Sequence, residues 1–172
     1  EQADTDGTKS ITGFEFAMRV AQKFMSLMTT QTLDGRVYEI DTRLRPSGEA
    51  GLLVTSLKAY EHYQLKSAWL WEHQALVRAR SIAGDEALCQ KFEIFRREIL
   101  TQSRDEAYVR EEVLKMRQKM KDHLGSSSEQ KKHGIFHLKQ DAGGIVDIEF
   151  MAQYAVLAWS GTKPDLAHYS DN

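Results

Sequence analysis

Residues 38–48 of the chain, YEIDTRLRPSG, place a charged side chain at every second position before a proline. Successive side chains of a β-strand point to opposite faces, so one face would carry two acids and two arginines: Glu39, Asp41, Arg43 and Arg45. Clustered carboxylates hold Mg²⁺ in phosphoryl transfer, and neighbouring arginines grip phosphate oxygens through paired hydrogen bonds. The pattern is compatible with a site for a metal and a polyphosphate. It is also compatible with a solvated edge strand whose ion pairs contribute little.

A second charged stretch, WEHQALVRAR (71–80), has the spacing of an amphipathic helix. Its expected packing face is apolar and comprises Trp71, Ala75, Ala79 and Ile82, and its polar residues Glu72, His73, Gln74, Arg78 and Arg80 surround that face. Solvated charges are the simplest interpretation. No second His or Cys lies at zinc-ligand spacing from His73, which argues against a zinc site.

The third stretch, LKQDAGGIVDIEF (138–150), places a glycine pair directly before a helix. Free N–H groups at a helix start can bind an anion. Asp147 and Glu149 in the first turn oppose the helix dipole favourably, but they would repel a phosphate unless a metal intervened. This stretch therefore predicts either an ordinary helix start or carboxylates that face a metal or a basic neighbour, for which Lys139 is the candidate.

The elements that would position these residues follow from periodicity and caps. We expect helices over about 13–30, 57–65, 67–82, 104–124 and 145–159, a strand from Tyr38 that ends at Pro46, and a polar, poorly ordered loop at 125–134. A further helix is expected after Asp85 as its N-cap, with one apolar seam of Leu88, Phe92, Phe95 and Ile99. The fold class predicted is α+β and predominantly helical. The predicted boundary separates a mixed unit (1–55) from a helical domain (56–172).

Composition narrows the class of protein. The chain has 172 residues, a net charge of −2 and 41% hydrophobic residues, which indicates a globular protein without the charge bias of a nucleic-acid-binding or membrane-surface protein. No apolar run reaches the roughly 20 residues of a membrane helix. The single cysteine, Cys89, fits a reducing compartment and a small buried side chain. The polar start without Met leads us to expect a longer parent protein.

Together, YEIDTRLRPSG, AWLWEHQALVRAR and LKQDAGGIVDIEF, in this order and at these separations, resemble the bacterial glutamine synthetase adenylyltransferases. The resemblance covers about Gly13 to Asn172. Members of this family have two halves, each with a nucleotidyltransferase domain of the DNA polymerase beta type followed by a helical domain. RLRPSG and WEHQALVRAR resemble the C-terminal, adenylylating half. The G-S-x-x-D-x-D motif of the family is absent here, so the resemblance implies a partial nucleotidyltransferase domain that lacks its N-terminal strands, followed by a helical bundle.

The resemblance also implies roles for individual residues. The reaction would be attack of a glutamine synthetase tyrosine on the α-phosphate of ATP with Mg²⁺. Asp41 matches the third metal-binding carboxylate and would bind metal, with Glu39 beside it, or take the tyrosine proton. Arg43 and Arg45 would grip phosphate or support the strand. Candidates for orienting ATP or the substrate loop lie in the helical motifs: Glu72, Arg78, Lys139, Asp147 and Glu149.

The implied partners are glutamine synthetase, a PII signalling protein and the other half of the enzyme, in the cytoplasm. Because the two upstream carboxylates are absent, we expect the isolated chain to be inactive. Two alternatives stay open. The chain could belong to the half that removes AMP by phosphorolysis, or residues 56–172 could be a helical module that docks glutamine synthetase or PII.

Overall fold

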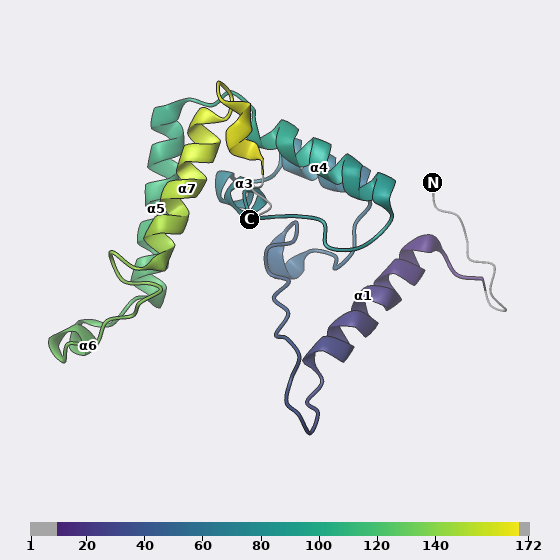
Figure 1. Cartoon of the computed structure of the whole chain (residues 1–172), viewed down its shortest axis with the longest axis horizontal. Helices are drawn as coiled ribbons and strands as arrows, with labels where there is room; N and C mark the ends of the chain where they lie inside the picture. The colour runs from purple at the N-terminus through teal and green to yellow at the C-terminus, as the bar shows by residue number, and fades with distance from the viewer. Residues whose placement is uncertain (1–9, 169–172) are drawn as a thin grey trace. The chain divides into compact units, whose positions relative to one another are not determined.

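The structure is a computed structural model that describes residues 10–168, and its regular elements within that range are helices (Figure 1). In chain order they are α1 (Gly13–Thr29), η1 (Gly48–Ala50), α2 (Leu57–Lys66), α3 (Leu70–Leu76), α4 (Glu86–Leu100), α5 (Glu106–Leu124), α6 (Ser128–Lys132), α7 (Ile145–Trp159) and η2 (Pro164–Ala167), where η marks a short 3₁₀ helix. The prediction of a predominantly helical chain is confirmed. The structure divides into two compact units, Glu1–Tyr63 and Gln64–Asn172.

The predicted strand after Tyr38 is wrong. Among the described residues, the β-type pairing is an isolated bridge between Thr32 and Gly35. A strand needs a neighbour that pairs its N–H and C=O groups, and the structure places none beside residues 38–45 within the described range. Turns form instead: the N–H of Arg45 donates to the carbonyl of Thr42 at 3.2 Å. The β part of the predicted α+β class is therefore missing from residues 10–168, and the likeness to a partial nucleotidyltransferase domain stays a prediction.

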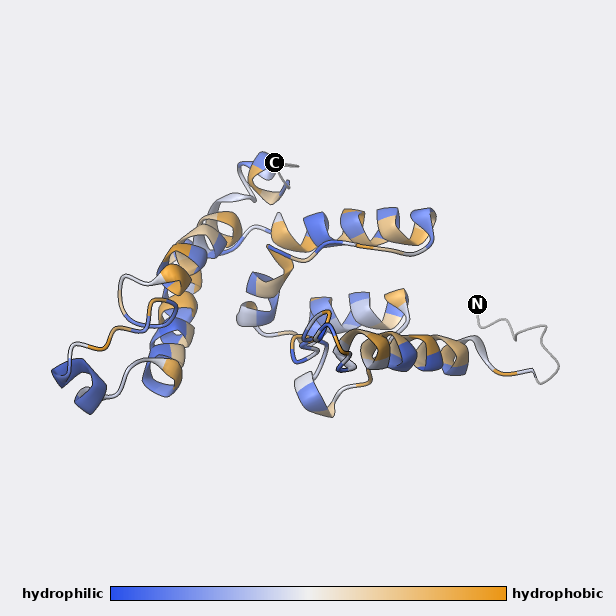
Figure 2. Cartoon of the chain, turned by 60° about the horizontal axis from the view of Figure 1, so that its bottom comes forward, coloured by the Kyte–Doolittle hydropathy of each residue, from blue (hydrophilic) through white to orange (hydrophobic). Residues whose placement is uncertain are grey.

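Helix α1 begins as its sequence predicts. The hydroxyl of Thr12 accepts the N–H of Glu15 at 3.1 Å, which satisfies one of the free donors of the first turn. None of its side chains is buried within this structure. Phe16, Val20 and Leu27 are each at least half exposed, and Figure 2 shows orange, hydrophobic segments along the helix next to the N-terminus.

The second unit has the hydrophobic core. Helices α5 and α7 are antiparallel neighbours (Figure 1), since α5 residues near the start of that helix contact residues near the end of α7. Helix α3 packs against both of them and against α4. The buried apolar residues of the core come from all these helices: Leu76, Phe95, Ile99, Leu100, Val109, Val113, Val146 and Leu157. The expected seam of α4 is confirmed at Phe95 and Ile99, while Leu88 is exposed.

Helix α3 differs from its prediction in length and in the face that it buries. It ends at Leu76 rather than near Ile82, which is 80% exposed. Its buried residues include Glu72, His73 and Gln74, which the periodicity had placed in solvent. Periodicity weighs apolar residues, whereas these polar side chains are buried because each finds a hydrogen-bond partner inside the unit.

The remaining helix boundaries follow caps that the sequence shows. The side chain of Asp85 accepts the N–H of Leu88 at 2.9 Å at the start of α4, and α7 spans the predicted residues. The loop 125–134 contains the short helix α6, whose first turn is closed by a capping box between Ser127 and Gln130. None of the helices in the described range is long and apolar enough to cross a membrane.

Candidate functional site

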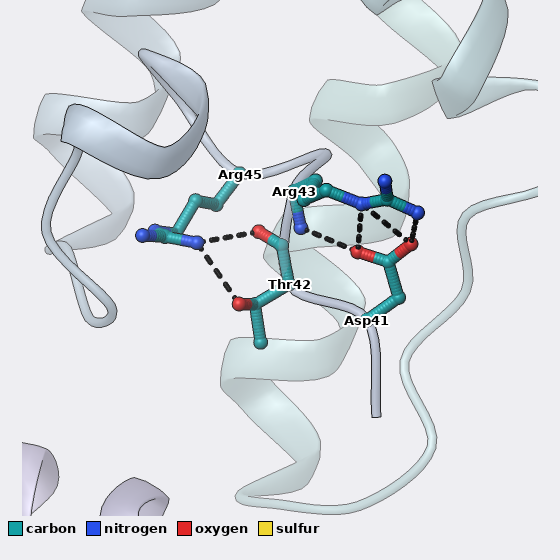
Figure 3. A network of polar contacts seen from close by, with 4 residues as sticks. All are labelled: Asp41, Thr42, Arg43 and Arg45. Carbon is teal, nitrogen blue, oxygen red and sulfur yellow. Dashed lines mark hydrogen bonds and ion pairs between the residues drawn. The ribbon is translucent and has the colours of Figure 1, made fainter. Parts of the chain in front are cut away.

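Arg45 connects several parts of the segment 41–51 through hydrogen bonds, and Figure 3 shows its contacts with Thr42. Its Nη1 donates to the carbonyl and the hydroxyl of Thr42 at 2.9 Å. Its Nε and Nη2 donate to the carbonyls of Gly51 and Glu49 at 3.1 and 2.9 Å. An arginine whose donors are used in this way fixes the backbone of the loop. The two predicted roles of Arg45, phosphate grip and support of a strand, stay predictions.

The loop also depends on a close backbone approach. A Cβ atom at Gly51 would lie 1.8 Å from the carbonyl oxygen of Pro46, so only glycine fits there. Ser47 adopts a left-handed conformation with φ of 61°, and its N–H donates to the hydroxyl of Tyr63 at 3.1 Å. The loop is thus anchored at both ends without a sheet.

Asp41 is the predicted metal-binding carboxylate of this loop, and Arg43 binds it directly (Figure 3). The Nε of Arg43 lies 3.0 Å from both carboxylate oxygens, its Nη2 lies 2.5 Å from Oδ2, and its backbone N–H donates to Oδ1 at 2.9 Å. These donors stabilise the ionised carboxylate, first through the side chain and then through the backbone, and lower the pKa of Asp41 to about 2. The Asp41 side chain is still 55% exposed, so a cation can reach it from solvent.

Glu39, the second predicted metal ligand, does not join Asp41. Its carboxylate pairs with Arg36 at 3.2 Å, and its side chain is 88% exposed. Residues 10–168 include no group of three His, Cys, Asp or Glu side chains that could hold a metal ion. By its charge and exposure, Asp41 suits Mg²⁺ as one oxygen ligand, and the described residues do not complete a site.

In the second unit, Arg78 and Glu149 form a pair that buried amides support. The Nη1 of Arg78 lies 2.9 Å from Oε1 of Glu149. The same oxygen accepts Nε2 of Gln153 at 3.4 Å, and Oε1 of Gln153 accepts Nε2 of Gln74 at 3.0 Å. This series of contacts joins α3 to α7 and leaves the Arg78 side chain 74% exposed. Sequence reasoning missed Gln74 and Gln153, because an amide in a helix has no spacing signature.

The other predicted residues of this unit have structural partners. Oε2 of Glu72 accepts the N–H of Trp69 at 2.8 Å, which caps α3. Asp147 accepts the Nε of Arg117 and, at 2.6 Å, the N–H of Gly143. The Gly143 bond, followed by the one from Arg117, lowers the pKa of Asp147. The basic neighbour of Asp147 is therefore Arg117 and not the predicted Lys139.

The buried His73 and the half-buried Arg104 form a further pair that the sequence did not indicate. The Nε2 of His73 lies 3.1 Å from the carbonyl of Gln64, and Nη2 of Arg104 lies 3.3 Å from its Nδ1. Burial, the largest effect, lowers the pKa of His73, which favours the neutral ring. A neutral ring that donates from Nε2 and accepts at Nδ1 satisfies both neighbours. Arg104 also donates to the carbonyls of Ile99 and Leu100, so the pair closes the end of α4.

Comparison with known proteins gives one family. The family model described as glutamate-ammonia ligase adenylyltransferase matches residues 1–94, more than half of the chain. The chain is similar to the bifunctional glutamine synthetase adenylyltransferase/adenylyl-removing enzymes of three bacteria. It is 88% identical to that of Acinetobacter baylyi over all of its 172 residues, and 52% identical to those of Pseudomonas aeruginosa and Vibrio parahaemolyticus over 99% and 98% of its length. It spans 19%, 18% and 17% of these relatives, respectively.

Proposed function

This chain belongs to the glutamate-ammonia ligase adenylyltransferase family, and we propose that, within a protein of its relatives' length, it takes part in AMP transfer from ATP to a tyrosine of glutamine synthetase. Asp41 then serves as one carboxylate ligand of a Mg²⁺–ATP complex. The observation that supports this role most is the loop geometry. An ionised, exposed carboxylate stands on a backbone that Arg45 fixes, with a pKa of about 2.

The residues of the loop have separate tasks in this proposal. Arg43 keeps the Asp41 carboxylate ionised and oriented, and its exposed side chain can contact a phosphate oxygen of the nucleotide. Arg45 keeps the loop in place. When bound, Mg²⁺ offsets the charge that develops on the phosphate oxygens. The upstream carboxylates that would complete the metal site come from the remainder of the longer protein.

The direction of the reaction is the finer part of the proposal. We assign the chain to the adenylylating half because RLRPSG and WEHQALVRAR resemble the sequence of that half. The relatives are named for both adenylyl transfer and adenylyl removal, which makes removal the second candidate. A protein that releases AMP from adenylylated glutamine synthetase only when phosphate is added, and loses this activity on changes in this loop, would support the second candidate.

The proposal is tested in a full-length chimera, in which this chain replaces the matching stretch of the Acinetobacter baylyi relative. We compare Asp41→Asn with Asp34→Asn, an aspartate of the same unit in the turn before the loop. AMP incorporation into glutamine synthetase is read by intact-protein mass. We expect Asp41→Asn to lower the rate at least about 100-fold and Asp34→Asn to leave it unchanged, because only Asp41 would bind the metal. Equal rates for both variants would overturn the assignment.

A further inference from the structure

A groove of about 440 Å³ runs between α5 and α7 in the second unit. At one end the hydroxyl of Tyr154 donates to Glu106 at 2.8 Å, and at the other Arg117 pairs with Asp147. The residues that line the groove lie at helical spacing on both helices: Glu106, Arg110, Val113, Leu114, Arg117, Asp147, Phe150, Met151 and Tyr154. On α5 these residues span about three turns and on α7 about two, which is the length of a short helix contact.

The groove and the surface beside it are apolar. Leu114 on α5 and Met151 on α7 are 58% and 66% exposed although they line the groove. Ile148, on the adjoining face of α7, is 67% exposed. Figure 2 shows orange segments along the α5–α7 pair at the left. Helix α7 is apolar on its buried and on its exposed side, and such a helix is normally buried on all sides.

Two arginines of the groove have donors without acceptors among the described residues. Arg110 is exposed and makes no hydrogen bond or ion pair with the residues that the structure describes. Arg117 is 9% exposed, and its Nη1 is buried without an acceptor in the same range. Because the Arg110 charge has no partner in this range, an occupant that carries an acidic side chain is favoured here over a purely apolar one.

We propose that this groove is the docking site of an amphipathic helix from the part of the full-length polypeptide outside residues 1–172. The helix presents apolar residues at i, i+3 or i+4, and i+7 to Leu114 and Met151, and an Asp or Glu to Arg110. The chain spans 17% to 19% of its relatives, so most of their polypeptide is available to supply it. A segment tethered to the groove binds at a high effective concentration, which favours it over a second copy or a free ligand. This assignment does not depend on the nucleotide chemistry of Asp41.

The test is site-specific photo-crosslinking in the full-length chimera. We place p-benzoylphenylalanine at Met151 on α7 or at Leu114 on α5, both of which line the groove. Glu111 is the matched control, because its side chain on α5 is 65% exposed and does not line the groove. A mixture of isotopically heavy and light protein separates crosslinks within one polypeptide from those between copies. We expect Met151 and Leu114 to give the same intramolecular crosslink to one apolar-periodic segment outside residues 1–172, and Glu111 to give none to that segment.

The acidic residue of the docking helix is tested by charge reversal. Arg110→Glu should lower the yield of the Met151 crosslink several-fold, and exchange of the acid in the crosslinked segment for arginine should restore it. Crosslinks only between heavy and light copies would replace the proposal with a dimer interface. The absence of any protein crosslink at both groove positions, in a chimera with an unchanged circular dichroism spectrum, would show that the groove is open and would also overturn the proposal.

Discussion

At the scale of single residues, two arginines of the same loop bind different kinds of acceptor. Arg45 and Arg43 are two positions apart in the sequence, yet one binds backbone carbonyls inside the loop and the other binds the exposed Asp41 carboxylate. Alternation on a strand would have given them the same role. The difference arises because the segment turns at Thr42–Arg45, so each side chain meets a different set of acceptors.

The pKa of Asp41 provides a residue-scale prediction. Arg43→Gln removes the side-chain donors that are the largest cause of the shift, so the pKa should rise from about 2 toward the model-peptide value of 3.8. Because the folded pKa is depressed, this pairing stabilises the loop above the unfolded pKa and is lost as the pH falls through the folded one. A ¹³C NMR titration of the Asp41 carboxyl measures it.

The control for this titration is Arg36→Gln, because Arg36 pairs with Glu39 and not with Asp41. It should leave the titration of Asp41 unchanged. If Arg43→Gln and Arg36→Gln gave the same midpoint as the unmodified chain, the direct pairing of Arg43 with Asp41 would be wrong.

At the scale of elements, the helices with strong caps and apolar periodicity were predicted from the sequence. The predictions were wrong where the formation of an element depends on tertiary contacts. Asp85 before α4 and the stripe of Val109 and Val113 on α5 are local features, so their helices were predictable. The strand at 38–45 was not, because a strand exists only with a partner.

The burial of polar side chains in the second unit could not be predicted from the sequence either. Arg96 is 1% exposed, and its donors reach the carbonyls of Leu76 and Ala167, which are far from it in the sequence. A charged residue on a helix is normally predicted to be solvated. Only the arrangement of α3, α4 and η2 brings those acceptors together, and the same holds for Gln74 and Gln153 of the candidate site.

The core of the second unit gives a prediction at this scale. Leu157→Ala should lower the free energy of unfolding by about 2–5 kcal/mol, since Leu157 is 0% exposed and its removal leaves a cavity between packed helices. Urea unfolding followed by circular dichroism measures the change. Leu138→Ala is the control, because Leu138 is 67% exposed and should change stability by no more than about 0.5 kcal/mol. Similar losses for the two variants would contradict the core as described.

At the scale of the whole molecule, the chain spans less than a fifth of its relatives. Two exposed surfaces can make contacts beyond those that the described residues make. One is the Asp41 carboxylate, which pairs with Arg43 and is exposed, and the other is the apolar groove between α5 and α7. Both surfaces are consistent with a chain that works within a longer protein.

This view predicts that the 172-residue chain alone does not transfer AMP. Its described residues hold no cluster of three metal-ligating side chains, and a single carboxylate binds Mg²⁺ too weakly to position a triphosphate. Incubation with ATP, Mg²⁺ and glutamine synthetase should leave the intact mass of glutamine synthetase unchanged, while the full-length chimera adds AMP under the same conditions. Transfer by the chain alone would show that its own residues complete the site.

The most direct test of the central claim, that Asp41 is a metal ligand, is a change of metal preference in the full-length chimera. Asp41→Cys replaces a hard oxygen ligand with a thiolate, which prefers softer ions. We predict that the rate of AMP transfer by Asp41→Cys in Mg²⁺ falls at least about 100-fold. Added Cd²⁺ should then raise the rate of Asp41→Cys at least about tenfold and leave the rate of Asp41→Ala unchanged. Equal responses of Asp41→Cys and Asp41→Ala to Cd²⁺, or full activity of either variant in Mg²⁺, would contradict the claim that Asp41 binds the metal.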